Sequence, residues 1–131
     1  MDPEEESGCV LLVDDDPEIL EAYCLILSAA GYKVRCAKDG AEALSILRSG
    51  ECSPCLIVLD LMMPRVDGFE FLARRSRDQR LAAVPVIVCS AISDLSGFRI
   101  GGDASAWLPK PVNVQALLHQ ARIWSRTDRP Q

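Results

Sequence analysis

The chain lacks any long apolar run and any recognisable targeting segment. None of its apolar runs approaches the roughly 20 residues that a helix needs to cross a bilayer. The segment from Met1 to Gly8 is acidic and has neither the basic nor the apolar region of a signal peptide. We therefore expect no membrane insertion and a cytoplasmic location. Disulfides are rare in that compartment, so the six cysteines should be reduced.

Basic residues are scarce relative to acidic ones. The chain has 14 Lys and Arg against 19 Asp and Glu, which gives a net charge of -5. Because nucleic-acid affinity comes mainly from neutralising phosphates, we expect no direct contact with nucleic acid. The length of 131 residues suits one domain with an ordinary core, and the composition, 49% hydrophobic and 25% charged, is that of a globular protein.

Histidine is nearly absent, so the one cysteine pair with metal-ligand spacing has few further residues that could complete a zinc site. Cys52-Ser53-Pro54-Cys55 forms a C-x-x-C motif, but a zinc site needs about four ligands and His119 is the only histidine. A thioredoxin-like pair follows a strand and opens a helix, whereas this pair precedes a strand-like run. Redox or metal chemistry here remains an alternative that would require a depressed thiol pKa. We interpret His119 as a surface residue of the last helix.

Short apolar runs alternate with amphipathic helical patterns throughout the chain. This alternation is typical of an α/β protein with a doubly wound parallel sheet. The predicted strands cover about 9–13, 33–37, 55–59, 85–89 and 105–108. Predicted helices begin after the capping residues Asp16 and Asp39, near Asp67-Gly68, and after the capping residue Asn113. A helix within 93–103 should be short or irregular, because that segment contains three glycines.

Polar residues follow the predicted strands at the points where the strands end. Asp14-Asp15 follows the first strand, Asp60 the third and Ser90 the fourth, while Lys110 follows the fifth. In open α/β sheets, ligands bind just beyond the carboxyl ends of the strands. Crowded carboxylates repel one another unless a cation joins them, and Mg²⁺ prefers oxygen ligands. The pattern therefore predicts one site that holds a metal ion, with a lysine and a serine suited to a phosphoryl group.

In this arrangement the sequence resembles the receiver domain of bacterial two-component response regulators. The resemblance rests on Asp14-Asp15, Asp60, Met63-Pro64, Asp67-Gly68, Ser90 and Lys110-Pro111, in that order. It covers 8–125, with 1–7 and 126–131 as flexible tails. It implies a flavodoxin-like three-layer sandwich whose five parallel strands have the order 2-1-3-4-5. The chain would act either as a stand-alone regulator, as chemotaxis regulators do, or as a fragment of a longer protein.

The resemblance also implies a function and a cofactor. Asp60 would accept a phosphoryl group from a sensor histidine kinase or a phosphotransfer protein, giving an acyl phosphate. The domain would catalyse only its own phosphorylation and dephosphorylation. Mg²⁺ (or Mn²⁺) would be held by Asp15, Asp60 and the backbone carbonyl of Met62, with Asp14 acting mainly through water.

The remaining site residues are implied in the same way. Lys110 would pair with a phosphoryl oxygen, and a cis peptide bond before Pro111 would aim its ammonium group at the site. Ser90 would move inward to donate its hydroxyl. Trp107 takes the place of the Tyr or Phe that usually swings inward with it. The signal would reach a downstream protein through the face of helix 4, strand 5 and helix 5.

Two apolar side chains bear on the lifetime of the phosphorylated state. Met62 and Ile92 lie two positions beyond Asp60 and Ser90, where the family's side chains flank the path of the hydrolytic water. Neither can orient that water, so we expect slow self-dephosphorylation.

A second interpretation of the whole chain stays open: a receiver fold that docks protein partners without depending on phosphorylation. Partner binding after Asp60→Ala would distinguish the two.

Overall fold

The computed structural model describes residues 9–50, 53–61, 68–90 and 104–125. Its elements are the strands β1 (Cys9–Val13), β2 (Lys33–Ala37), β3 (Pro54–Asp60), β4 (Val86–Ser90) and β5 (Ala106–Pro109) and the helices α2 (Pro17–Ala29), α3 (Gly40–Ser49), α4 (Gly68–Ser76), α5 (Gln79–Ala82) and α6 (Val114–Ser125). The described helices include none that is long and apolar enough to cross a membrane.

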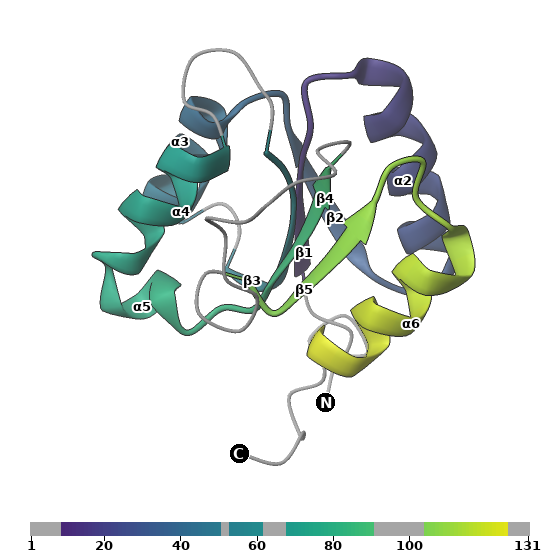
Figure 1. Ribbon diagram of the computed structural model, residues 1–131. Helices are drawn as coiled ribbons and strands as arrows, with labels where there is room; N and C mark the ends of the chain where they lie inside the picture. Colours follow the sequence, from purple (N-terminus) through teal and green to yellow (C-terminus); the bar gives the residue numbers. More distant parts are fainter. Residues whose placement is uncertain (1–8, 51–52, 62–67, 91–103, 126–131) are drawn as a thin grey trace.

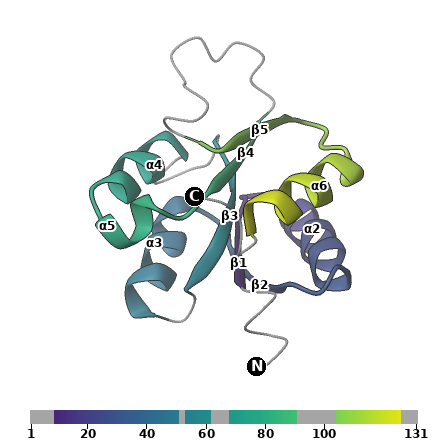
Figure 2. The ribbon, with the colours of Figure 1, turned by 90° about the horizontal axis from the view of Figure 1, so that it is seen from below.

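All five strands are parallel and form one sheet in the order β2-β1-β3-β4-β5, as the sequence predicts. Helices α2 and α6 cover one face of the sheet, and α3, α4 and α5 cover the other (Figures 1 and 2). The three layers confirm the flavodoxin-like sandwich. Because each crossover returns the chain in the same direction, the carboxyl ends of all the strands meet at one edge.

The core is divided between the two faces of the sheet. In β1, Val10 and Leu12 pack in the cluster under α2 and α6, whereas Leu11 and Val13 pack in the cluster under α3 and α4. All four side chains are buried. A central strand covered on both faces needs apolar residues at every position, which is why it can be recognised as a continuous apolar run. The edge strand β2 has alternately exposed side chains, as the more polar sequence predicts.

Capping residues determine where the helices begin and end. Asp16 Oδ1 accepts a hydrogen bond from the Glu18 amide at 2.9 Å, and Asp39 Oδ1 accepts one from the Glu42 amide at 2.8 Å. Asn113 Oδ1 accepts one from the Ala116 amide at 3.0 Å. These contacts satisfy amides that have no partner within the helix, and they confirm the three predicted N-caps.

The single-turn helix α5 has no counterpart among the predicted elements. It depends on a tertiary contact: the Arg75 guanidinium donates hydrogen bonds from α4 to the carbonyls of Ala82 and Val84. Burial lowers the pKa of Arg75. Four residues are too few to show a helical period, so this turn could not be recognised from apolar spacing. The helix expected within 93–103 lies outside the described residues.

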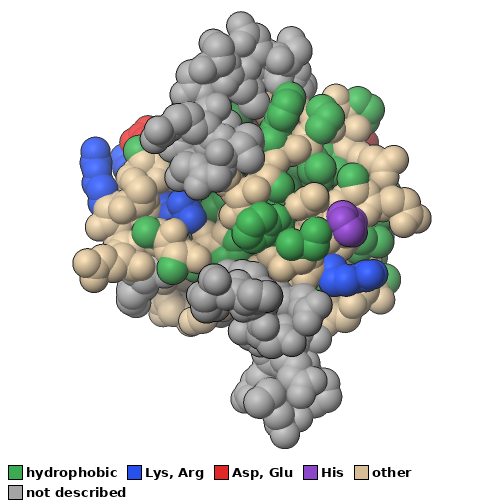
Figure 3. Space-filling model, turned by 60° about the horizontal axis from the view of Figure 1, so that its bottom comes forward, with side chains coloured by type: hydrophobic (Ala, Val, Ile, Leu, Met, Phe, Trp, Pro, Cys, Tyr) green, Lys and Arg blue, Asp and Glu red, His purple; other side chains and the backbone are tan. Residues whose placement is uncertain are grey.

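The interpretation of His119 as a surface residue is confirmed. Its side chain is exposed on α6, and the histidine is visible on the molecular surface beside basic side chains (Figure 3).

Candidate functional site

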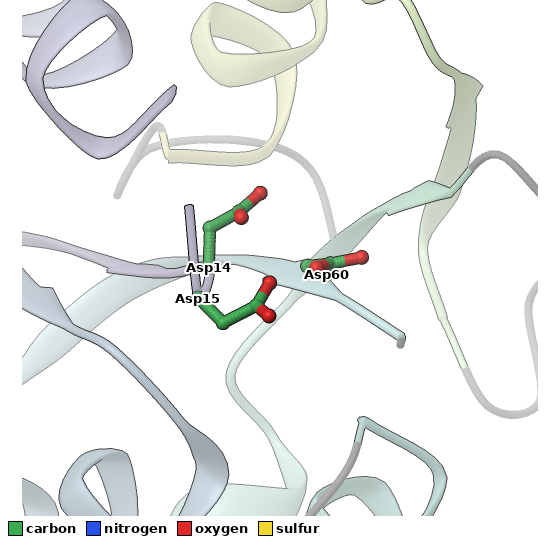
Figure 4. A group of neighbouring side chains, drawn as sticks. All are labelled: Asp14, Asp15 and Asp60. Carbon is green, nitrogen blue, oxygen red and sulfur yellow. The ribbon is translucent and has the colours of Figure 1, made fainter. Parts of the chain in front are cut away.

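Three carboxylates gather at the carboxyl edge of the sheet. Asp14 and Asp15 follow β1 directly, and Asp60 is the last residue of β3. One oxygen from each of the three lies within 4.8 Å of the others, and Figure 4 shows the three side chains close together. Asp14 is 2% exposed and Asp60 5%, whereas Asp15 is open to solvent. Two buried carboxylates therefore lie beside one that a solvent ion can reach.

Strand register explains why these residues meet although they are far apart in sequence. Val13 of β1 pairs with Leu59 of β3, so the residues that follow them, Asp14 and Asp60, emerge side by side. The Asp14 amide donates to the carbonyl of Ala37 at 3.1 Å, and Asp14 Oδ1 accepts from the amide of Asp16 at 2.9 Å. These two contacts fix the backbone and the carboxylate of Asp14.

Lys110 supplies the positive charge of the site. Its Nζ lies 3.0 Å from Asp14 Oδ2 and 3.5 Å from Asp60 Oδ1. The peptide bond between Lys110 and Pro111 is cis, and the Lys110 amide donates to the carbonyl of Ser90 at 2.9 Å. Burial alone would lower the pKa of Lys110, but the hydrogen bond to Asp14 and the charges of both carboxylates outweigh it and raise the pKa. The lysine is thus held as an ammonium ion.

The donor set fits a small divalent cation. Three carboxylates against one ammonium leave the cluster with excess negative charge, and carboxylate oxygens are the ligands that Mg²⁺ prefers. Ligands at about 2.1 Å from one ion are at most about 4.2 Å apart, close to the spacing already present. Asp14, Asp15 and Asp60 are therefore the side chains able to hold such an ion.

Ser90 and Trp107 lie beside this cluster on β4 and β5. Ser90 is wholly buried at the end of β4, and Trp107 pairs with Val88 in the sheet. Trp107 packs against the cluster under α3 and α4, and its indole N–H is buried with no hydrogen-bond partner among the described residues. A buried donor without a partner costs about 1–3 kcal/mol.

Two residues near the site were interpreted from the sequence only as packing residues. Burial raises the pKa of Tyr23, and the Cys89 thiol and the acidic cluster add to that shift while Lys110 opposes it. Burial also raises the pKa of the Cys89 thiol to about 12. Tyr23 belongs to the apolar stripe of α2, so its helical period gives no sign of this proximity. Met62, Ile92 and Cys52, which the sequence singles out, lie outside the described residues.

A family model matches most of the chain. The response regulator receiver domain model matches residues 10–122. The chain is 39% identical over 125 residues to the DNA-binding dual master transcriptional regulator RpaA of Synechocystis sp., covering 92% of this chain and 50% of that protein. It is also 39% identical over 125 residues to response regulator MprA of Mycobacterium avium, covering 93% of this chain and 53% of that protein. The chain thus spans about half the length of these relatives.

Solved structures lead to the same family. A putative response regulator from Chloroflexus aurantiacus matches with a TM-score of 0.80 and 30% identity, covering 90% of this chain and 97% of that one. Chemotaxis response regulator CheY4 of Vibrio cholerae matches with a TM-score of 0.77 and 29% identity, covering 88% and 96%. Sequence, fold and the placement of the acidic residues agree: the chain belongs to the receiver domain family of two-component response regulators.

Proposed function

We propose that this receiver domain accepts a phosphoryl group on Asp60 in a reaction that depends on a divalent cation. The observation that carries the proposal is the cluster itself: three carboxylates within 4.8 Å, with the Lys110 ammonium 3.5 Å from Asp60 Oδ1. A structural ion pair would need only one carboxylate. The additional two, one of them open to solvent, favour a site for a cation and a transferred anion.

The chemistry assigns the nucleophile to Asp60. A carboxylate oxygen of Asp60 would attack the phosphorus atom of a phosphohistidine, forming a P–O bond as the P–N bond breaks. The products are an acyl phosphate and a neutral imidazole that leaves with a proton. Asp15, Asp60 and the backbone carbonyl of Met62 would hold Mg²⁺ or Mn²⁺, with Asp14 acting mainly through water, and the bound ion would supply charge neutralisation and in-line alignment.

Lys110 holds the product after transfer. In the unphosphorylated protein its Nζ is closer to Asp14 than to Asp60. The ion pair with the nucleophile, Asp60, is therefore the weaker of the two. Once Asp60 carries a phosphoryl group, the ammonium ion pairs with a phosphoryl oxygen. The raised pKa of Lys110 keeps this charge in place at neutral pH.

Ser90 and Trp107 change position when Asp60 is phosphorylated. The Ser90 hydroxyl donates to the phosphoryl group after moving inward. Trp107 follows, because the end of β4 pairs with β5 and the two residues lie on adjacent strands. The indole N–H of Trp107 has no partner among the described residues, which supports this role, since a rearrangement that gives it a partner recovers free energy. The altered face, formed by β5, α6 and the helix that the sequence predicts within 93–103, binds a downstream protein.

The proposal extends to the partner, the domain limits and the phosphate lifetime. The phosphodonor is a sensor histidine kinase or a phosphotransfer protein, consistent with the two-component relatives. The functional unit is 8–125, which encloses the matched residues 10–122.

Met62 and Ile92 make hydrolysis of the acyl phosphate slow. Met62→Asn should therefore increase the rate of dephosphorylation, measured as loss of adduct mass over time, and an unchanged rate would contradict this assignment.

The test is phosphorylation by a small donor. The protein is incubated with acetyl phosphate with and without Mg²⁺, and the adduct is measured by intact mass, beside Asp60→Ala. Asp16→Asn is a matched control, because Asp16 caps α2 and its replacement keeps a capping side chain. We expect an adduct in the wild type and in Asp16→Asn, but not without Mg²⁺ or in Asp60→Ala. A folded wild type without adduct would instead support the docking module that does not depend on phosphorylation.

A further inference from the structure

Arg75 is a buried charge that the proposed phosphorylation chemistry does not use. It lies near the end of α4 and is 9% exposed. A single guanidinium nitrogen, Nη2, donates to the carbonyl of Ala82 at 3.0 Å and to the carbonyl of Val84. The chain that leads into β4 is itself anchored, because the Ile57 amide of β3 donates to the carbonyl of Pro85 at 3.0 Å. Arg75 therefore ties α4 to the neighbouring α5 (Figure 1) and, through the residues that follow it, to the sheet.

The surroundings of Arg75 favour precise placement over stability. Burial lowers the pKa of Arg75, because the charged guanidinium is less stable away from water. Nε is buried and has no hydrogen-bond partner among the described residues, so no contact with them offsets that part of the loss. An apolar side chain of similar volume often stabilises a core as well as a buried charge does. What the guanidinium adds is two directional contacts, which fix α4 relative to the carbonyls of Ala82 and Val84.

The first turn of α4 touches the proposed phosphoacceptor. The Gly68 amide donates to the carbonyl of Leu61 at 2.9 Å. A Cβ on Gly68 would lie 2.7 Å from the Asp60 carbonyl oxygen, so the helix already abuts the end of β3. Arg75 lies about two turns further along the same short helix. A displacement of α4 at Arg75 is therefore passed on to the contact between Gly68 and Asp60.

We propose that Arg75 is a positioning residue for the phosphorylation of Asp60, which it supports by holding α4 in place along the helix axis. The inference rests on the proposed function, because it concerns the same phosphoacceptor. The contacts of Arg75 place α4 relative to both strands that end at the site. Strand β3 ends at Asp60, and β4, which follows soon after Val84, ends at Ser90. The Asp60 backbone is thereby held against the first turn of α4, and its carboxylate keeps its place beside Lys110.

Arg74 provides a matched control. It precedes Arg75 in α4, but its side chain is 41% exposed and its guanidinium pairs with Glu70, one turn earlier in the same helix. An ion pair within one helix cannot set the position of that helix relative to the sheet. Arg74→Met should therefore leave the rate of phosphorylation unchanged, whereas Arg75→Met should lower it.

The first measurement is the initial rate of adduct formation on the full chain. Acetyl phosphate and saturating Mg²⁺ are used, the adduct is followed by intact mass, and each rate is divided by the folded fraction from circular dichroism. Arg75→Met should react about 10-fold more slowly than wild type, because small displacements of reacting groups have large effects on rate. In Arg75→Lys one ammonium nitrogen can donate to both carbonyls, so the rate should return to within about 2-fold of wild type.

Amide hydrogen exchange of the folded proteins gives a second measurement, which does not depend on phosphorylation. If Arg75 positions α4, Arg75→Met should raise the exchange rate of the Gly68 amide about 10-fold and leave the amides of β1 as protected as in wild type. If Arg75 only stabilises the fold, the added exchange occurs through global unfolding, and Gly68 and β1 lose protection together.

The results separate the role of Arg75 from the proposed function. A wild type that forms no adduct would contradict the proposed function, and the positioning role with it. A wild type that forms the adduct no faster than folded Arg75→Met would overturn the role of Arg75 alone. The same conclusion would follow from equal losses of protection at Gly68 and in β1, or from a slow Arg75→Met whose rate Arg75→Lys does not restore.

Discussion

Lys110 Nζ lies 3.0 Å from Asp14 Oδ2 but 3.5 Å from Asp60 Oδ1, so the lysine is bound more closely to the Asp14 carboxylate than to that of Asp60, the proposed phosphoacceptor. The Asp14 side chain is also held by the Asp16 amide, which leaves it little freedom to move. The positive charge is therefore anchored beside Asp60 before any phosphoryl group arrives. Preorganised charge of this kind needs no rearrangement when the reaction begins.

The ion pair predicts a pH dependence at the alkaline end. The folded-state pKa of Lys110 is raised above its ordinary value of about 10.5, so its stabilising contribution is complete below that value and is lost as pH rises through the folded-state pKa. Lys110→Met removes the ammonium partner of two buried carboxylates and should lower the free energy of unfolding by about 1–3 kcal/mol at neutral pH.

Urea unfolding of both proteins from about pH 7 to 11 measures this difference. The gap between wild type and Lys110→Met should be constant up to about pH 9 and shrink above about pH 10.5. Because Lys110 lowers the pKa values of Tyr23 and Cys89, both proteins carry Tyr23→Phe and Cys89→Ala in this comparison. Cys36 also has a raised pKa, but it is present in both proteins and cancels. A gap that widened with pH would contradict the assignment of the charge.

Removing the exposed carboxylate should separate cation binding from folding. Asp15 is open to solvent, so Asp15→Asn should change the free energy of unfolding without Mg²⁺ by less than about 0.5 kcal/mol. The wild type should gain about 2.7 kcal/mol when Mg²⁺ is at 100 times its dissociation constant, and the variant should gain much less at the same concentration. Thermal unfolding across a Mg²⁺ titration, with Asp16→Asn as control, provides the measurement. An equal increase in stability with Mg²⁺ in Asp15→Asn and Asp16→Asn would exclude Asp15 as a ligand.

Gly68 is expected to tolerate no side chain. A Cβ at this position would lie 2.5 Å from the Leu61 Cα and 2.7 Å from the Asp60 carbonyl oxygen, so the start of α4 must shift away from β3. Gly68→Ala should destabilise the fold by about 1–3 kcal/mol and weaken phosphorylation of Asp60. In Gly50→Ala the added Cβ meets nothing within 4 Å, and the cost of about 1–2 kcal/mol comes from the positive φ of 80° alone.

The two glycine variants are distinguished by activity rather than by stability. Adduct formation with acetyl phosphate, measured at a temperature where both variants are folded, should be reduced only in Gly68→Ala. Equal phosphorylation of both would show that the approach of α4 to Asp60 does not matter to the site.

Trp107 should be replaceable by phenylalanine at little cost. Trp107→Phe loses part of a half-buried ring but also removes an N–H that has no partner among the described residues, so the free energy of unfolding should stay within about 1 kcal/mol of wild type. Trp124 is the matched control, because its Nε1 donates to Gln120 Oε1 at 2.9 Å and Trp124→Phe loses that bond as well as ring area. Chemical denaturation of both variants should therefore show the larger loss for Trp124→Phe, and the reverse order would contradict this account.

The sheet and most of its helices could be predicted because their signals are local. The central strands are covered on both faces and so appear as apolar runs, and the helix caps at Asp16, Asp39 and Asn113 follow from single side chains. The meeting of Asp14 with Asp60 could also be predicted, since parallel strands place their ends at one edge. These features need no knowledge of tertiary contacts.

The features that could not be predicted depend on contacts between distant residues. Helix α5 rests on the Arg75 guanidinium, and the preference of Lys110 for Asp14 depends on sub-ångström differences in position. Helical spacing likewise identifies packing residues without showing what lies next to them.

The most direct test of the central claim is the chemical identity of the phosphorylated residue. Borohydride reduces an acyl phosphate to an alcohol, so treatment of the phosphorylated protein should convert Asp60 alone to homoserine, detected by peptide sequencing in the mass spectrometer. Our account predicts this conversion at Asp60, dependent on Mg²⁺ and on prior exposure to the phosphodonor. Conversion at Asp14 or Asp15 instead, or none in a protein that carries a phosphoryl adduct, would contradict it.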